Sequence, residues 1–485
     1  MKLFKYSIIG VFLLAGCEKY LSEEPKKQAS IKTVSQLEAL VDNATAFSYE
    51  SNYTAVYSTD DAEISKDLYK NNPNAFTVDN LQYYVFKVDG VANLAADQLW
   101  NTEFKKIFTA NLILTSIDEV SGDDATKQRV KADAHFIRAY SYWLLANHYC
   151  APYTAANLNS LGLPIKKTLD YTESLKRATL KETYDFILSD IAEAQKVAVD
   201  DVESLKPWRV SKKALSAFMS RFYLFTGDLD NSLVQSNNAL ATVNAKLVDF
   251  KTIKPGIPKT YANPAAKLDH VELNDWAASK FLYWSEFYYT RYTYTPAQWF
   301  VPSSALLALY DTQNDLRYKS FVFTNGGRRF SVVTPAAARY TVFSDGRYIP
   351  AGFTVAEVLL NKAEVLARKG DVTAAMDAVN MLRLKRMSTY VALSATDKDD
   401  AIKKVLEERR RELPFAMRWY DIRRFSVNDY PADNVTVTRD FFEVSSTGVN
   451  VNSPKTYTLE AKRLLVPING VEMDSSKGQI VQNPY

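Results

Sequence analysis

Apolar residues recur with a helical period in several segments of this chain. After Thr354, one face carries Val355, Val358, Leu359, Leu360, Ala363, Leu366 and Ala367. Gly370-Asp371 interrupts this face, and a second one follows at Ala374, Ala375, Ala378, Val379 and Leu382. Because a glycine closes a helix in the left-handed conformation without steric cost, the pattern predicts two helices joined by a tight turn.

An earlier segment has the same design. It carries Ala214, Leu215, Phe218, Phe222 and Leu224 before Gly227-Asp228, and Leu233, Ala239 and Leu240 after it. We therefore predict two copies of one helical hairpin. Hairpins of roughly 34 residues resemble tetratricopeptide units, which need neighbours to bury their apolar faces.

Four further helices are predicted, at 34–43, 100–119, 129–149 and 180–198. Thr179 and Thr354 each precede a glutamate by three residues, at Glu182 and Glu357. This T-x-x-E spacing is the capping box that marks a helix start.

The remaining segments, at about 44–99, 242–350 and 426–485, show little helical period and predict loops and short strands, apart from one helix at 303–310. The helical segments, at about 30–43, 100–241 and 351–425, alternate with them along the chain. The sequence therefore predicts a mainly α fold in which a helical scaffold is interleaved with a loop-rich layer, as one unit over 17–485.

The pattern of the first sixteen residues predicts a lipoprotein signal peptide. Lys2 and Lys5 precede an apolar run too short to span a bilayer, and the run ends in Leu14-Ala15-Gly16-Cys17. Small residues leading directly into a cysteine indicate a bacterial lipobox, so we expect cleavage before Cys17 and its acylation. The competing interpretation is an ordinary signal peptide with an incidental cysteine.

The balance of charges argues against nucleic-acid binding, and the cysteine content argues against an intrachain disulfide. Residues 17–485 hold 57 basic against 56 acidic side chains, so no electrostatic footprint for nucleic acid is present. With Cys17 acylated, only Cys150 remains, and no intrachain disulfide can form. We expect Cys150 to be a buried small hydrophobic residue rather than a reactive thiol.

Aromatic residues concentrate between Trp276 and Phe300, where eleven of 25 positions are aromatic against 13% in the whole chain. In an extended segment, alternation places Tyr288, Tyr292 and Tyr294 on one face. Aromatic faces stack on sugar rings while hydroxyl and guanidinium groups donate hydrogen bonds, although most of these rings are also expected to serve the core. A second cluster includes Tyr53, Tyr57, Tyr69, Tyr83 and Tyr84. The predicted ligand-binding residues are Tyr69, Tyr83, Tyr84, Trp276, Trp284, Tyr288, Arg291, Tyr292 and Trp299.

Motifs for catalysis are weak in this sequence. No G-x-S-x-G, H-E-x-x-H or glycine-rich phosphate loop occurs, and His135, His148 and His270 are spaced as structural residues. Asp60, Asp61 and Glu63 could bind a cation or act in acid-base chemistry, but capping or hydrogen bonding to loops is the favoured role. We expect no catalytic residues, no cofactor and no metal ion.

Charged residues are dense from Glu407 to Arg424. Glu407 and Arg411 have the spacing of an i,i+4 ion pair on a helix. Arg418, Asp421 and Arg424 follow at helical spacing, and we expect them to form a partly buried ion network that joins scaffold to insertion.

In their order, several motifs resemble the SusD/RagB family of outer-membrane nutrient-binding lipoproteins over essentially the whole chain. They include the post-lipobox segment Cys17–Leu21, Arg138-Ala139-Tyr140, Trp208–Lys212, Glu408–Phe415, Arg418–Arg424, Leu465–Ile468 and the ending Gln482–Tyr485. Ala416 departs from the glutamate that the family often has there.

The resemblance implies a lipid-anchored, cell-surface protein without enzymatic activity. It would bind an oligomeric nutrient, a glycan in first place, and deliver it to a SusC-like TonB-dependent outer-membrane transporter. The resemblance also implies that the helical layer contacts the transporter and the irregular layer holds the ligand. The same architecture capturing peptides, a surface glycoside hydrolase and a purely structural scaffold remain as alternatives.

Overall fold

The computed structural model describes residues 31–87, 98–252, 284–294, 300–323, 340–341 and 348–484. The predicted signal peptide and Cys17, together with His270, Trp276 and Trp299, lie outside these residues. Within them the predicted mainly α architecture is confirmed, because helices dominate and the sheets are small. No described helix combines the length and hydropathy that crossing a bilayer requires.

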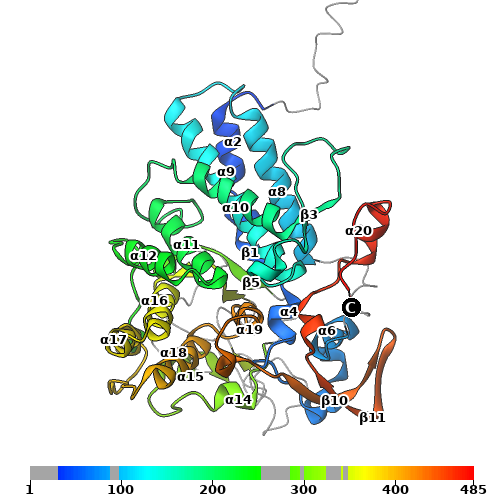
Figure 1. Ribbon diagram of the computed structural model, residues 1–485, viewed down its shortest axis with the longest axis vertical. Coiled ribbons are helices and arrows are strands. Elements are labelled where there is room, and N and C mark those ends of the chain that lie inside the picture. The colour runs from blue at the N-terminus through cyan, green and yellow to red at the C-terminus, as the bar shows by residue number, and fades with distance from the viewer. Residues whose placement is uncertain are drawn as a thin grey trace, which may run out of the picture.

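Four helices make up the upper half of the molecule (Figure 1). They are α2 (Val34–Val41), α8 (Gln98–Ser116), α9 (Asp124–Tyr149) and α10 (Leu180–Ala194). A separate apolar cluster holds α2 against α8 and α9 through Leu37, Ile113 and Ile137. The side chain of Asp123 accepts a hydrogen bond from the Thr126 amide, so α9 begins five residues before the predicted start.

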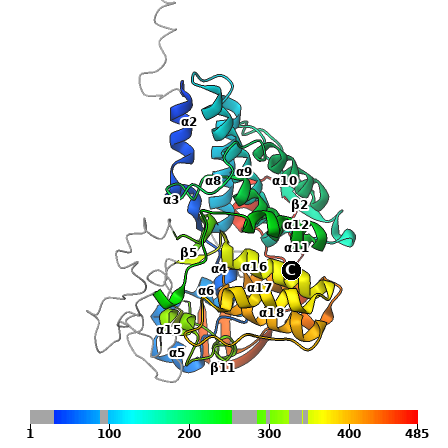
Figure 2. The ribbon, with the colours of Figure 1, turned by 90° about the vertical axis from the view of Figure 1, so that its left-hand side faces the viewer.

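The two predicted helical hairpins are confirmed. One consists of α11 (Lys212–Thr226) and α12 (Leu229–Leu240), and the other of α16 (Val355–Lys369) and α17 (Val372–Arg383). Gly227 at φ +83° and Gly370 at φ +87° end the first helix of each hairpin. The hairpins stack because α12 contacts α16, and α18 (Lys398–Glu412) continues the stack, as Figure 2 shows.

The two predicted capping boxes differ in the structure. Thr179 and Glu182 form the complete reciprocal box at α10. At α16, Thr354 accepts a hydrogen bond from the Glu357 amide, but the Glu357 carboxylate turns to Arg221 on α11. Glu357 therefore joins the two hairpins to each other instead of completing a box.

Residues 44–87 are more helical than the sequence pattern predicts. They form α3 (Ala44–Ser48), α4 (Tyr53–Tyr57), α5 (Lys66–Asn71) and α6 (Val78–Tyr84). Each has five to seven residues, fewer than two turns, so no apolar period can be recognised in it. Conversely, the predicted helix at 303–310 covers only α14 (Ser304–Leu307).

Short strands lie between the helical layers (Figure 1). In a three-stranded sheet, β5 (Tyr292–Tyr294) pairs in parallel with β1 (Tyr49–Glu50) and antiparallel with β8 (Tyr348–Pro350). The preceding strand, β4 (Phe287–Tyr289), pairs instead with β9 (Phe353–Thr354). The chain therefore passes from one sheet to another between β4 and β5.

The remaining elements complete the periphery. Near α9 and α10, β2 (Leu161–Pro164) pairs with β3 (Arg177–Thr179). Beside α15 (Leu316–Phe321), β6 (Val322–Phe323) pairs with β7 (Tyr340–Thr341). After α19 (Arg418–Phe425), the C-terminal segment forms the hairpin of β10 (Thr438–Ser445) and β11 (Gly448–Thr458), then α20 (Gly470–Ser475).

Candidate functional site

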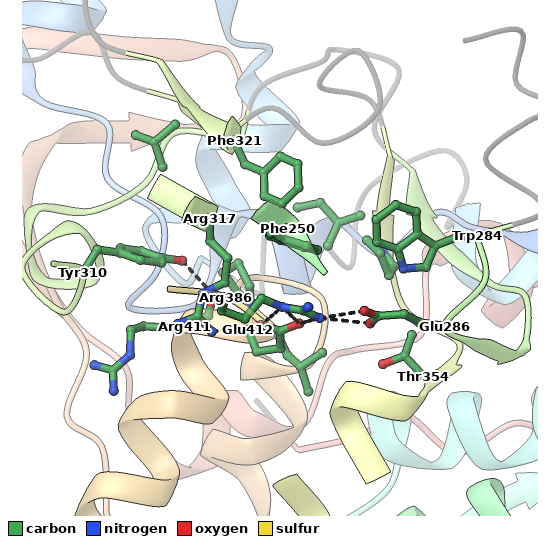
Figure 3. A pocket seen from close by; sticks show the side chains of 15 residues that line it. Phe250, Trp284, Glu286, Tyr310, Arg317, Phe321, Thr354, Arg386, Arg411 and Glu412 are labelled. Carbon is green, nitrogen blue, oxygen red and sulfur yellow. Dashed lines mark hydrogen bonds and ion pairs between the residues drawn. The ribbon is translucent and has the colours of Figure 1, made fainter. Parts of the chain in front are cut away.

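A small pocket lies where the irregular layer meets the end of α18 (Figure 3). Its walls come from the short helix Phe250–Thr252, from Trp284, from β8 and from α15 (Leu316–Phe321). These elements are far apart in sequence, so the pocket exists only in the folded chain.

Aromatic side chains line one side of the pocket. Phe250 meets Phe321 edge to face, with ring centroids 5.5 Å apart and planes at 89°, and meets Trp284 at 6.2 Å and 73°. Phe287 and Tyr292 complete this small apolar cluster behind the wall. The indole of Trp284 is 7% exposed and borders the pocket.

Arg386 is fully buried against this aromatic wall, and with Glu286 and Glu412 it forms what we call the floor of the pocket. Its guanidinium lies over the Phe250 ring at 3.9 Å from the centroid. Nη2 donates to Glu286 Oε1 and to Glu412 Oε1, each at 2.8 Å, and Nη1 donates to the Val248 carbonyl at 2.7 Å. A cation that is stacked and bonded in its plane is fixed in one orientation.

Two further arginines support this floor. Arg317 forms a two-point ion pair with Asp315 and donates to Glu412 Oε2 at 2.8 Å. Arg411 is bonded to Glu408, and the hydroxyl of Tyr310 donates to the Arg411 carbonyl at 2.8 Å. The arginines that line the pocket are thus matched by carboxylates.

The pKa values of the two carboxylates in the pocket, Glu286 and Glu412, are shifted in opposite directions. Burial raises the pKa of Glu286, and Arg386 offsets only part of that effect. Burial also acts on Glu412, but there Arg386 and Arg317 together outweigh it and lower the pKa. Because both carboxylates are bonded to the same guanidinium, proton transfer to a substrate would require breaking an ion pair.

This arrangement suits recognition of a ring that carries hydroxyl groups. An aromatic wall accepts the apolar face of such a ring, and the carboxylate oxygens of the floor accept hydrogen bonds from hydroxyls. Among the described residues that line the pocket, each arginine is paired with a carboxylate and so is not left unmatched for an anionic ligand. The geometry therefore favours an uncharged, partly apolar ring.

Of the predicted ligand residues, Trp284 lines this pocket and Tyr292 lies behind its wall. Tyr292 is 1% exposed and Tyr288 is fully buried, with its hydroxyl donating to the Ala239 carbonyl at 3.1 Å. In this conformation neither ring presents a surface to a ligand.

Arg291 lies outside the pocket, in a buried ion cluster with Glu50 of β1 and Glu103 of α8. Its Nε donates to Glu50 Oε1 at 3.1 Å and its Nη2 to Glu103 Oε2 at 2.9 Å. The expected single extended segment is wrong, because the chain changes sheets here and residues 287–293 are buried without alternation.

The second predicted cluster is also enclosed. Tyr69 packs edge to face on Phe441 with ring centroids 5.4 Å apart, and Tyr84 also packs edge to face on Phe441 at 5.4 Å. The Tyr84 hydroxyl accepts a hydrogen bond from the Ile64 amide at 2.9 Å, and Tyr83 is 7% exposed. Tyr84 borders an open polar groove between α5 and β10, and Tyr83 borders a small pocket beside Trp419.

Asp60, Asp61 and Glu63 take the favoured structural roles. Asp60 holds Arg418 at 2.7 Å, and Asp61 holds Arg410 at 2.6 Å and the Phe415 amide at 2.9 Å. Glu63 accepts from the Ser304 amide. Among the described residues, no group of three or more histidine, cysteine, aspartate or glutamate side chains is placed to hold a metal ion.

The expected ion network after Glu407 is confirmed in part. Arg418 joins Asp60 of the insertion, while Asp421 bonds Arg409 and Arg424. Arg411 does not pair with Glu407 as predicted, because it is buried and pairs with Glu408 one turn away.

The isolated cysteine and histidines are structural where they are described. Cys150 is fully buried, and burial raises the pKa of its thiol to about 11. His135 Nδ1 lies 2.7 Å from Asp190 Oδ1, and His148 Nε2 lies 3.2 Å from Thr54 Oγ1. No sequence pattern identified Phe250, Phe321, Arg386 or Glu412 as pocket residues. Glu286 lies within the aromatic run, but the run was interpreted by its rings and not by this carboxylate.

Comparison with known proteins identifies the family. A model described as "Starch-binding associating with outer membrane" matches residues 19–224, and the model of the SusD family matches 349–485. The chain is 24% identical over 387 residues to the SusD-like protein P38 of Formosa agariphila. The aligned region covers 67% of this chain and 71% of that protein.

Solved structures show the same fold. A SusD superfamily protein from Bacteroides thetaiotaomicron matches 93% of this chain and 100% of its own at a TM-score of 0.64 and 19% identity. A laminarin-binding SusD-like protein matches 94% of this chain and 100% of its own at a TM-score of 0.59 and 16% identity. Because the two SusD models together match more than half of the chain, the chain belongs to the SusD/RagB family.

Proposed function

We propose that this protein is a cell-surface lipoprotein that binds an oligomeric nutrient, most directly a glycan, and delivers it to a TonB-dependent outer-membrane transporter. The observation that carries the proposal is the match of 93% of the chain to a SusD-superfamily structure. Its support includes a relative of the same fold that binds laminarin, and a family model described as outer-membrane associating.

The pocket supplies a physical basis for glycan recognition. Trp284 and Phe321 line the pocket with aromatic side chains, and the Glu412 carboxylate, held in place by Arg386 and Arg317, is the polar group of the floor that we propose accepts a hydroxyl. Since these charges are matched, the proposed ligand is a neutral sugar rather than a uronate or a sulfated sugar.

Calorimetry against soluble glycans and peptide pools tests the ligand class. We expect saturable heat with at least one neutral glycan and none with peptides. Saturable binding of peptides alone would replace the glycan proposal by peptide capture. Release of reducing ends from a bound glycan would contradict a purely binding role.

Anchoring and partnership need separate tests. In cells fed labelled palmitate, the native chain should incorporate label and Cys17→Ala should not. Purification of a tagged chain from detergent-extracted outer membranes should recover a large β-barrel transporter. Recovery of the native chain without such a barrel would contradict delivery to a transporter, while leaving glycan binding intact.

A further inference from the structure

A pair of stacked aromatic rings lies on the outside of the helical layer, away from the pocket. The rings of Phe108 on α8 and Tyr171 have centroids 6.3 Å apart and planes at 27°. Tyr171 is 87% exposed and Phe108 is 39% exposed. Tyr171 belongs to the loop between β2 and β3, which runs beside α8 in the upper half of Figure 1, whereas α15 and α18 lie in the lower half.

The loop that presents Tyr171 is held by a chain of buried polar contacts. Asn111 Nδ2 donates to the carbonyls of Lys166 and Thr168 at 3.1 and 3.3 Å. Asn111 Oδ1 in turn accepts from Arg138, which is bonded at two points to Asp190. The tyrosine therefore stands on a fixed support.

Contacts within the loop complete this support. The Asp170 carboxylate accepts from the Thr172 amide at 2.7 Å, which closes the turn around Tyr171. The Lys166 ammonium donates to the Glu173 carbonyl at 2.5 Å, and the Leu175 amide donates to Gln479 at 2.8 Å. Ordering the loop before binding removes an entropic cost that a ligand would otherwise meet.

The size and surroundings of this pair identify its ligand class. An aromatic side chain buries at most about 150–250 Å², whereas one partner of a stable protein interface buries about 800 Å². Close to the two rings in sequence, Lys105, Asp170 and Thr172 are exposed and polar. One free aromatic face within a polar rim matches a sugar ring better than an apolar protein surface.

We infer that Tyr171, stacked on Phe108, forms a second carbohydrate-binding site on the helical layer. This inference rests on the proposed function and adds a contact for chains long enough to engage more than the pocket. A polymer would bind at both places, while a trisaccharide would occupy one.

Affinity electrophoresis tests the second site with the full chain in gels that contain soluble starch, laminarin, xylan or mannan. We expect Tyr171→Ala and Phe108→Ala to weaken polymer binding about 2- to 12-fold, the range that an aromatic contact of about 0.5–1.5 kcal/mol represents. Tyr171→Phe should retain binding because the ring remains. Leu205→Ala, at a side chain 80% exposed elsewhere, is the matched control.

The outcomes separate this inference from the proposed function. Weaker polymer binding by Tyr171→Ala with unchanged trisaccharide binding in calorimetry supports the second site. Unchanged polymer binding by this variant overturns the second site and leaves the proposed function standing. If Tyr171→Ala binds the polymer as the native chain does but no longer recovers the transporter from membranes, the rings form a protein contact and the second carbohydrate site is overturned. If no polymer retards the native chain, both ideas fail.

Discussion

The guanidinium of Arg221 holds the carboxylate of Glu357 at two points, with Nε–Oε1 and Nη2–Oε2 distances of 2.6 Å. Both side chains are 1% exposed. The pair joins α11 to α16, and Arg221 also donates to the carbonyls of Ala351 and Gly352. One buried ion pair therefore fixes the two helical hairpins and the turn that leads from β8 to β9.

Replacing Glu357 by Gln should destabilise the fold strongly. The change leaves a buried guanidinium without its counter-charge, and breaking a buried pair in this way costs about 3–5 kcal/mol. The free energy of unfolding from urea denaturation measures the loss. The double variant Arg221→Met/Glu357→Leu should lose less than either single one, because it removes both charges.

The exposed pair of Lys181 and Asp185 provides the matched control for that comparison. Its nitrogen and oxygen are 2.6 Å apart, but the side chains are 58% and 57% exposed. Asp185→Asn should leave the free energy of unfolding nearly unchanged, because solvent screens an exposed pair. Equal losses for Glu357→Gln and Asp185→Asn would contradict the role given to burial.

The helical hairpins could be predicted from sequence because their determinants are local. Apolar spacing defines each face, and a glycine followed by an aspartate defines each turn, so 214–240 and 355–382 are recognisable without the fold. The short helices of residues 44–87 lack such a period, and their caps alone do not distinguish them from turns.

The ion pairs and the pocket could not be predicted in the same way. Arg418 and Asp60 are 358 positions apart, and Arg386 and Glu286 are 100 apart. Helical spacing predicted an ion pair between Glu407 and Arg411, but spacing does not reveal which face of the helix is buried. The aromatic run could not be assigned for the same reason. Its alternation suggested one exposed face, but the segment around Arg291 is covered on both sides.

His148 should make the fold sensitive to acid. Burial, with a smaller contribution from nearby Arg423, lowers its pKa from 6.5 to about 3 in the folded chain. Between these values the unfolded chain binds a proton that the folded chain does not, so stability falls as the pH falls from about 6.5 to 3.

The variant His148→Gln isolates this effect. Its free energy of unfolding should fall less steeply between pH 6.5 and 4, by up to about 1.4 kcal/mol per pH unit relative to the native chain. Carboxylates contribute to acid unfolding in both proteins and cancel in the difference. Parallel curves for the two proteins would refute this assignment.

Two glycines should respond differently to alanine. At Gly370, with φ +87°, a Cβ would meet nothing within 4 Å, so Gly370→Ala adds only backbone strain of about 1–2 kcal/mol. At Gly352, a Cβ would lie 2.1 Å from the Tyr289 carbonyl oxygen and 2.6 Å from the Arg291 nitrogen. Because both neighbours are backbone atoms, Gly352→Ala must displace the strands.

Thermal unfolding compares the two glycine variants directly. The midpoint should fall by a few degrees for Gly370→Ala and much further for Gly352→Ala. Gly370→Asn should recover part of its loss, since asparagine tolerates the left-handed conformation better than alanine. A smaller loss for Gly352→Ala than for Gly370→Ala would show that the strands can separate easily at this position.

Trp284 is the residue through which the pocket should act on a glycan. Trp284→Ala removes the aromatic surface and should weaken binding about 30-fold, which corresponds to about 2 kcal/mol for an aromatic anchor. Trp284→Phe keeps a ring and should stay within a few-fold of the native affinity. Calorimetry with the glycan that the native chain binds gives both values.

Phe287→Leu separates binding from folding in that experiment. Phe287 is 1% exposed and belongs to the same aromatic cluster, but it does not line the pocket. It should therefore lower the unfolding midpoint as a core substitution does while leaving glycan affinity unchanged. If Trp284→Ala retained native affinity with its fold intact, the glycan would have to bind elsewhere on the chain. An equal loss of affinity in Phe287→Leu would instead attribute the effect to the stability of the cluster.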